Sequence, residues 1–331
     1  MGTGRQVVVH ANQWAEYSQV ADVTNICSII AGMRVEYREE PCKVALNRVK
    51  GMPFEWSLNP YMGCAHCCTF CYVRAFERRA DRPSDARYGT SIRVKVNIVD
   101  VLRLQLGRKR WAGEGIAIGS ATDPYQPAEG RYKLTRGCLE VLRNASNPFS
   151  IITRGPLIVR DVDVLVEASL RAPVSVTFSV PTVDDDVWRT TEPGTAPPRQ
   201  RLRALKVLVE AGVRASVGMA PLLPGLSDHP RSIERVVVAA REAGACGIWA
   251  NLLYLRPGTR EHFLECLVRD WPELLPDYER LYARGAYLPR SEAEPARNEV
   301  RSLAKAHGIR DRRPQPLRPH PRDEQLSLLS A

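Results

Sequence analysis

From about residue 90 onward, short apolar stretches of the sequence alternate with longer amphipathic ones. The short stretches are partly β-branched and bounded by Gly or Pro, as buried strands are. They are GIAIGSATD (115–123), FSIITRG (149–155), VSVTFSV (174–180), ASVGMAP (215–221) and GIWANLLYL (247–255). Apolar residues recur at helical spacing in 97–108, 135–145, 160–171, 198–212 and 231–244. This alternation predicts a parallel sheet covered by helices.

The stretch FEWSLNP (54–60) supplies a further strand before these and brings the strand–helix units to six. Six units indicate an α/β fold, a partial (β/α)6 barrel of the TIM type. An open, flavodoxin-like sheet is the alternative, because the sequence does not determine whether a sheet closes. In both folds the functional side chains lie at the carboxyl ends of the strands.

We expect four segments along the chain. Residues 1–53 lack the strand–helix rhythm and form an N-terminal extension, and residues 54–257 form the core. Residues 258–309 have helical patterning and form a C-terminal extension. Residues 310–331 are rich in Pro and Arg and are expected to be extended or disordered.

The net charge of +10 favours polyanionic partners such as nucleic acid, although an arginine-rich composition has the same effect without one. The sequence has no uninterrupted apolar run long enough to span a membrane. The first residues also lack the apolar stretch of a secretory signal. We therefore expect a cytoplasmic protein with no membrane partner.

The stretch NPYMGCAHCCTFCYVR (59–74) concentrates four cysteines: Cys64, Cys67, Cys68 and Cys71. In a reducing compartment such a group indicates metal or redox chemistry rather than disulfides. Structural zinc normally takes two ligand pairs on separate turns, and no second CxxC follows. An iron–sulfur cluster held by three cysteines fits better. Cys64 and Cys71 belong to either possible register, with Cys68 (CxxxCxxC) or with Cys67 (CxxCxxxC) as the third ligand.

CxxxCxxC with an aromatic residue before the last cysteine resembles the signature of radical SAM enzymes. Phe70 is that aromatic residue, and the resemblance selects Cys64, Cys68 and Cys71 and leaves Cys67 as an additional thiol. Over about residues 40–290 the chain also resembles the spore photoproduct lyase-like branch, whose members are often labelled DNA repair photolyases. The segments concerned are CKVALNRVKGMPFEWSLNPYMGCAHCCTFCYVR, GSATDPYQPAEGRY, ITRGPLIVRDVDVL, VSVTFSV, TTEPGTAPPRQRL and APLLPGLSD.

The resemblance implies an enzyme whose [4Fe–4S] cluster is held by three cysteines. The fourth iron then binds S-adenosylmethionine, whose reductive cleavage gives a 5′-deoxyadenosyl radical that abstracts hydrogen from the substrate. Cys67 has to point away from that open iron. A lyase-like reaction on a DNA lesion or modified base is the implied function, with a reductase, flavodoxin or ferredoxin as electron donor.

The same resemblance assigns the S-adenosylmethionine contacts to strand ends. In the loop after the second strand, Gly119 permits close backbone approach, and Ser120 and Asp123 accept hydrogen bonds from the methionine amino group. An ordinary turn with a helix cap is the other interpretation of this loop. Further contacts are expected from Arg154 to the carboxylate, Ser179 to the ribose, Asn251, Tyr254 and Arg256 to the adenine, and Phe70 and Tyr72 to cofactor or substrate.

The chain departs from spore photoproduct lyase in one respect. That enzyme carries a cysteine hydrogen donor near the loop after the second strand, where this chain has Ala121 and Thr122. Tyr125 is the candidate catalytic residue that remains in this loop.

Two further stretches point to partners. RAFERRADRPSDARYG, which follows the cysteines, places arginines where phosphates of a polyanion would arrive, or forms a solvated face because carboxylates are interleaved. The C-terminal residues resemble the QL(S/D)LF peptide that docks proteins on the bacterial sliding clamp. The peptide consists of Gln325, Leu326, Ser327, Leu328 and Leu329.

Three functions are compatible with the sequence. The first is a radical SAM enzyme acting on nucleic acid. The second is a radical SAM enzyme acting on a small molecule or peptide. The third is a non-catalytic iron–sulfur protein docked on the sliding clamp.

Overall fold

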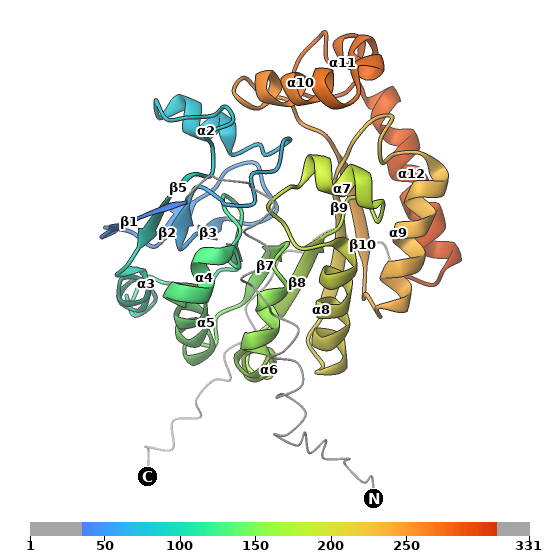
Figure 1. The fold of residues 1–331 in the computed structure, drawn as a ribbon. Coiled ribbons are helices and arrows are strands. Elements are labelled where there is room, and N and C mark those ends of the chain that lie inside the picture. Colours follow the sequence, from blue (N-terminus) through green and yellow to red (C-terminus); the bar gives the residue numbers. More distant parts are fainter. Residues whose placement is uncertain (1–34, 310–331) are drawn as a thin grey trace, which may run out of the picture.

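The computed structural model describes residues 35–309 and has a seven-stranded main sheet in the order β10-β9-β8-β7-β6-β3-β2 (Figure 1). Six neighbouring strands are parallel, and β2 (Leu46–Arg48) is antiparallel to β3. The sheet ends at β10 and β2, so the six predicted units form an open, partial barrel. The parallel strands are β3 (Trp56–Leu58), β6 (Ile116–Ile118), β7 (Phe149–Thr153), β8 (Val174–Ser179), β9 (Ala215–Leu222) and β10 (Ile248–Leu252).

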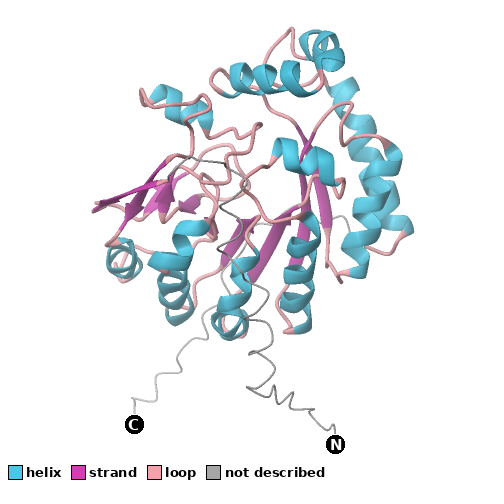
Figure 2. Cartoon of the chain, in the orientation of Figure 1, coloured by secondary structure: helices cyan, strands magenta, loops and turns pink. Residues whose placement is uncertain are grey.

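Helices pack along the outer side of this sheet (Figure 2). Helix α8 shows why, since Leu202, Leu205 and Leu208 recur at helical spacing and are all buried. The connecting helices are α3 (Ile98–Leu106), α4 (Pro127–Tyr132), α5 (Leu134–Asn144), α6 (Val162–Ser169), α7 (Asp185–Thr191), α8 (Pro198–Glu210) and α9 (Pro230–Glu242). A 3₁₀ helix, η4 (Pro156–Asp161), precedes α6.

A second sheet, which the sequence analysis did not predict, lies beside the first. It has the order β1-β5-β4, from β1 (Glu36–Glu40), β5 (Ser91–Lys95) and β4 (Tyr61–Met62). Strand β1 is mostly exposed and charged, so it carries no alternating apolar pattern. Strands β1 and β2 both come from the stretch before residue 54, and β2 extends the main sheet.

The C-terminal helices cover one end of the main sheet and its β10 edge (Figure 1). Their bounds are α10 (Thr259–Asp270), η5 (Pro272–Leu274), α11 (Leu275–Leu281) and α12 (Arg290–Ala306). The predicted helical C-terminal region is thus confirmed. Val300 and Ala304 of α12 are buried in the main core. The predicted Pro- and Arg-rich tail 310–331, with its Gln325–Leu329 peptide, lies outside the described residues.

None of the helices between residues 35 and 309 is both long and apolar enough to cross a membrane.

The packing of α8 on the sheet gives a stability prediction. Replacing Leu205, which is 0% exposed, with Ala is expected to lower the free energy of unfolding by about 2–5 kcal/mol, because the cavity left behind cannot be filled. Leu104 of α3 is the matched control, a helical leucine that is 71% exposed, and Leu104→Ala should stay within about 0.5 kcal/mol. Urea unfolding followed by circular dichroism measures both, and equal losses would contradict the packing described.

Candidate active site

The cysteine loop connects β4 to α2 (Arg74–Arg79) and therefore follows the first parallel strand at its carboxyl end (Figure 1). Two turns shape it, closed by bonds from the N–H of Cys67 to the Cys64 oxygen (3.3 Å) and from the N–H of Cys71 to the Cys68 oxygen (3.2 Å). Cys67 joins the turns in the left-handed region at φ 51°. Two cysteines adjacent in sequence, Cys67 and Cys68, thereby take different directions.

Burial is the main cause of the raised pKa of three thiols in this loop, those of Cys64, Cys67 and Cys68. Burial raises the pKa of the Cys64 thiol, and the negative charges of Asp123, Cys68 and Cys71 raise it further. Burial also raises the pKa of Cys67, to about 11, but Cys71 is the single cysteine that contributes there. Cys64 is thus influenced by both Cys68 and Cys71, and Cys67 is influenced by Cys71.

Cys67 and Cys71 both contact Tyr88, in the segment after α2. Cys67 Sγ lies 3.4 Å from the Tyr88 carbonyl oxygen, and Cys71 Sγ lies 3.5 Å from the Tyr88 hydroxyl oxygen. Gly89 follows at φ 88°, where a Cβ atom would lie 2.5 Å from both the Cys64 oxygen and Cys67 Sγ. This contact requires glycine and holds the fourth thiol on the Tyr88–Gly89 side of the loop.

Cysteine thiols on one loop are the donors that a cluster of several irons takes. Within residues 35–309, no group of three or more His, Cys, Asp or Glu side chains is placed to hold a metal ion. A four-iron cluster binds its cysteine thiolates through different irons, so it requires thiols that are spaced apart on one loop. Cys64 and Cys68 are buried and Cys71 is half-buried, so the three thiols are largely shielded from water.

Asp123, in the loop after β6, ties two strand ends to the cysteine loop. Its Oδ1 accepts bonds from Thr153 Oγ1 (2.7 Å) and the Tyr125 N–H (2.8 Å). Its Oδ2 accepts from the Arg154 N–H (2.6 Å) and lies 3.4 Å from His66 Nδ1. Burial opposes its charge, but His66 and these hydrogen bonds outweigh burial and hold its pKa at about 2. Both oxygens are thus in use, and Asp123 orients the loops around it.

Gly119 and Ser120 lie between the same elements. Gly119 has φ 86°, and a Cβ atom there would approach the Ile152 carbonyl oxygen to 2.3 Å. Asn59 Nδ2 donates to Ser120 Oγ (3.4 Å), and the Tyr72 hydroxyl donates to the Ser120 carbonyl oxygen. The structure therefore brings the predicted Gly119–Ser120 loop against Tyr72, the residue after the last cysteine.

Arg154 lies beneath the cysteine loop in a buried ion-pair group. Its guanidinium carbon is 5.6 Å from the centre of the Phe70 ring, and its Nε is 2.5 Å from Glu192 Oε1. The other oxygen of Glu192 lies 2.9 Å from Nη1 of the fully buried Arg201. Burial disfavours the charge of Glu192, yet the adjacent Arg201 and Arg154 keep its pKa below the usual value.

Of the predicted residues Ser179 and Asn251, one contacts the group formed by Arg154, Glu192 and Arg201 and the other does not. Ser179 ends β8, donates its hydroxyl to the Ala220 oxygen (2.9 Å) and accepts at its own carbonyl from Arg201 Nη1 (2.8 Å). Asn251 is exposed on β10, where the pairing with β9 shifts register, and its side chain makes no hydrogen bond to residues 35–309. Contacts in the structure therefore link Ser179, but not Asn251, to the Arg154 group.

Tyr125 is fully engaged in the protein interior. Its hydroxyl donates to Asp161 Oδ2 (3.1 Å), and Asp161 in turn pairs with Arg160 (2.8 Å) and Arg136 (3.1 Å). This hydroxyl is committed to a buried ion-pair network, and the placement favours a structural role over hydrogen donation to a substrate.

The sequence analysis missed the floor of the cysteine loop, which the TTEPGT segment supplies. The Gly194 N–H donates to the His66 oxygen (3.0 Å), and the Thr69 N–H donates to the Thr191 oxygen (2.9 Å). Glu192 lies between them, and no role had been assigned to it or to Arg201. The detectable signal was the segment itself, a Gly and a carboxylate between two helices in a stretch that carries the family resemblance.

The arginines that follow the cysteine loop are held within the protein. Arg74 is buried and donates to the carbonyl oxygens of Cys68, Ser84 and Asp85. The others bond to carboxylates or stack on an aromatic ring. The contacts are Arg78 to Glu261, Arg79 over Phe76, Arg82 to Glu77 and Arg87 to Asp85. These arginines are thus a poorer phosphate-binding group than their number in the sequence indicates.

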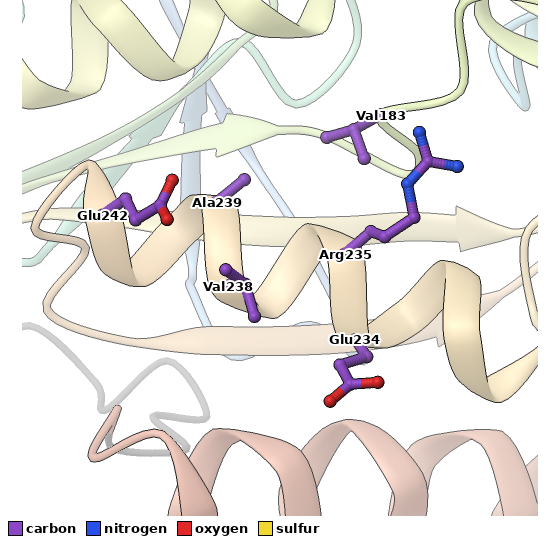
Figure 3. A pocket seen from close by; sticks show the side chains of 6 residues that line it. All are labelled: Val183, Glu234, Arg235, Val238, Ala239 and Glu242. Carbon is purple, nitrogen blue, oxygen red and sulfur yellow. The ribbon is translucent and has the colours of Figure 1, made fainter.

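A pocket of about 360 Å³ lies elsewhere, on the surface of α9 (Figure 3). Arg235 extends toward Val183 and Glu234 extends to the opposite side of the helix, and the lining includes no cysteine. It is lined by Val183, Glu234, Arg235, Val238, Ala239 and Glu242. This pocket is separate from the group of strand-end residues described above.

Comparison with known proteins identifies related sequences and folds. Residues 58–237 match the family described as the radical SAM superfamily. An uncharacterized protein of Mycobacterium tuberculosis is 38% identical over 286 residues, which cover 85% of this chain and 84% of the relative.

Solved structures of spore photoproduct lyase have a similar fold. One, a mutant with bound AdoMet and dinucleoside spore photoproduct, aligns with TM-score 0.62 and 15% identity over 82% of this chain and 79% of that chain. A cysteine-to-serine mutant aligns with TM-score 0.64 and 15% identity over 92% and 85% of the two chains.

The floor of the cysteine loop leads to a prediction for Gly194. In Gly194→Ala the added Cβ would lie 2.4 Å from the Ala65 oxygen and 2.8 Å from the His66 oxygen, so the loop has to move. We expect a loss of about 1–3 kcal/mol in unfolding free energy and a lower iron content after cluster reconstitution. Gly130→Ala is the control, because the nearest atom to its added Cβ is 4.0 Å away. Iron content equal to that of the control would contradict the contact.

The buried ion-pair group leads to a second prediction. Glu192→Gln leaves Arg154 and Arg201 without their shared counter-charge, and breaking a buried pair in this way costs about 3–5 kcal/mol. Glu210→Gln removes an exposed partner of Lys206, 3.9 Å away, and should cost less than about 1 kcal/mol. Urea unfolding measures the loss of unfolding free energy in both variants. Equal losses would contradict the role of Glu192 as the shared counter-charge.

Proposed function

This chain belongs to the radical SAM superfamily, and we propose that it reductively cleaves S-adenosylmethionine to a 5′-deoxyadenosyl radical that acts on nucleic acid. The cofactors are S-adenosylmethionine and a [4Fe–4S] cluster. We assign Cys64, Cys68 and Cys71 as the cluster ligands. The observation that carries this assignment is the CxxxCxxC spacing of these cysteines, with Phe70 before the last one, inside the segment that matches the family.

Binding of such a cluster has to remove the protons of the cysteine thiols. Burial raises the pKa of Cys64 and of Cys68. Loading the cluster therefore releases protons. The turn geometry keeps Cys67 against Tyr88, so that it does not compete for the iron that S-adenosylmethionine occupies.

In such an enzyme the cofactors carry out the radical chemistry, and the protein side chains bind and orient S-adenosylmethionine. A cluster held by Cys64, Cys68 and Cys71 would, once reduced, supply the electron for cleavage of S-adenosylmethionine. Arg154 is held by Glu192 and by a bond from Nη2 to the Ala220 oxygen (3.1 Å), while its Nη1 donates to no atom of residues 35–309. We propose that Nη1 of Arg154 pairs with the carboxylate of S-adenosylmethionine. The Gly119–Ser120 loop, with Tyr72 across it, is the proposed boundary for the methionine end.

The proposed substrate class rests on charge and fold. The chain carries a net charge of +10, and a spore photoproduct lyase structure of similar fold contains a dinucleoside photoproduct. In this chain Thr122 occupies the loop after β6 and donates its hydroxyl to the Gly63 oxygen (2.6 Å). Because no thiol is present there, we propose a DNA lesion or modified base as substrate rather than the same photoproduct.

The surroundings of the enzyme are part of the proposal. A cytoplasmic location keeps the thiols reduced. A reductase, flavodoxin or ferredoxin supplies the electron. The Gln325–Leu329 peptide is proposed to dock the protein on the sliding clamp.

The test is anaerobic reconstitution followed by reduction and addition of S-adenosylmethionine, with 5′-deoxyadenosine as the measured product. We expect product from the wild type and from Cys67→Ala, and none above background from Cys68→Ala, because the latter lacks a cluster ligand. Iron content of all three proteins is measured in parallel.

Three results would contradict the proposal or a part of it. Iron bound by the wild type without any 5′-deoxyadenosine formed would leave a non-catalytic iron–sulfur protein. Loss of product in Cys67→Ala but not in Cys68→Ala would mean that the ligand register is wrong. Radical chemistry without retention on DNA, in a salt series, would favour a small-molecule or peptide substrate.

A further inference from the structure

Two stacked tyrosines lie on the surface next to β10. Tyr254 follows the strand, Tyr287 belongs to the segment between α11 and α12, and their ring centres are 4.2 Å apart with the planes at 32°. Tyr287 is 71% exposed. Leu253 and Leu255, on either side of Tyr254, are buried at 1% and 2% exposure. The backbone therefore alternates inward leucines with an outward tyrosine, and the stacked pair is not part of the core.

One exposed arginine lies over a ring of this stack, and two more are close to Tyr287 in sequence. The guanidinium carbon of Arg256 lies 5.2 Å from the centre of the Tyr254 ring. Arg284 and Arg290 are each three residues from Tyr287, and all three arginines are exposed. None of the three forms an ion pair with a carboxylate in residues 35–309, although most exposed arginines near the cysteine loop do. We call Tyr254, Arg256, Arg284, Tyr287 and Arg290 the tyrosine–arginine patch.

The two segments of the patch are joined to each other and to the cysteine loop. The Leu255 N–H donates to the Ala286 oxygen (2.9 Å), which fixes one segment beside the other. Thr259 Oγ1 donates to the Cys71 oxygen (3.0 Å), so the loop after β10 also contacts the last cysteine. In Figure 1 the segments that follow β3, β8 and β10 lead to helices at one end of the sheet. The patch thus lies on the same rim as the candidate active site.

We propose that the tyrosine–arginine patch is a stacking platform for an unpaired base of the nucleic acid substrate, with the arginines on the adjoining phosphates. The inference rests on the proposed function and names the residues that would bind its substrate. Bases stack on aromatic side chains irrespective of sequence, and guanidinium groups contribute both stacking and phosphate contacts. An enzyme that acts on a base has to take that base out of the duplex, so a platform beside the barrel end suits an extruded or single-stranded segment.

The adenine of S-adenosylmethionine is the competing occupant, because the sequence analysis placed Tyr254 and Arg256 near it. Charge distinguishes the two. S-adenosylmethionine carries a single carboxylate and a positive sulfonium, whereas three unpaired arginines match a chain of phosphates. The exposure of Tyr287 also suits a ligand that approaches from the surface.

The test is fluorescence anisotropy of a labelled oligothymidylate of about fifteen nucleotides with the reconstituted protein, over a series of salt concentrations. Tyr287→Ala is expected to weaken binding about 10-fold, whereas Tyr287→Phe keeps a ring and should stay within about 2-fold. Replacing Arg256, Arg284 and Arg290 together with Gln should reduce the slope of log affinity against log salt by about 0.7 per arginine. Arg103→Gln on α3 controls for charge, since that arginine is exposed but paired with Asp100 at 2.6 Å.

The outcomes separate the platform from the proposed function. If the wild type binds the oligonucleotide and the patch variants bind equally well, the platform is wrong and the nucleic acid substrate stands. If the wild type cleaves S-adenosylmethionine but does not bind the oligonucleotide, the nucleic acid substrate fails and the platform with it. Loss of S-adenosylmethionine affinity in Tyr287→Ala, with unaltered oligonucleotide binding, would assign the stack to the cofactor and overturn the proposal. Thermal unfolding of each variant verifies that it is folded.

Discussion

The site depends on one buried carboxylate, Glu192, shared between two guanidinium groups. Arg154 comes from the end of β7, and Arg201 from α8 reaches the carbonyl oxygen at the end of β8. Arg154 also bonds to the Ala220 oxygen of β9 and stacks on Phe70. Charges this deep in a protein are costly unless paired, so the group is stable only when all three members are in place. The ends of three strands and the underside of the cysteine loop are thereby fixed together.

Most of the fold follows from periodicity. The six parallel strands are apolar because helices cover them, and this pattern is visible in a single sequence. The superfamily prediction is confirmed by the family match, and the spore photoproduct lyase-like fold by the solved structures. The sheet of β1, β5 and β4 could not be predicted in the same way. Its exposed, charged strand β1 is held by pairing with β5, which lies far along the chain.

The sequence predicts those parts of the candidate site that depend on residues close together in the chain. It does not predict the parts that depend on which distant side chains the fold brings into contact. The spacing of the cysteines is a local property, as is the Gly119 turn. Whether an arginine is free to bind a phosphate cannot be seen from the neighbouring sequence, because it depends on which carboxylates the fold brings near. Carboxylates pair with Arg78, Arg82 and Arg87 after the cysteine loop, but not with Arg256. Tyr125 illustrates the same point, since only the fold reveals its bond to Asp161.

The contact between the cysteine loop and the TTEPGT segment also has a bearing on biosynthesis. Thr69 and Thr191, joined through their backbones, are separated by more than a hundred residues, and the Glu192 group beneath them needs α8 as well. During translation the cysteines are synthesised well before the TTEPGT segment and α8, against which the cysteine loop packs. Iron delivery is therefore expected to follow translation of most of the chain, and a nascent chain stopped before α8 would expose its thiols without a means of arranging them.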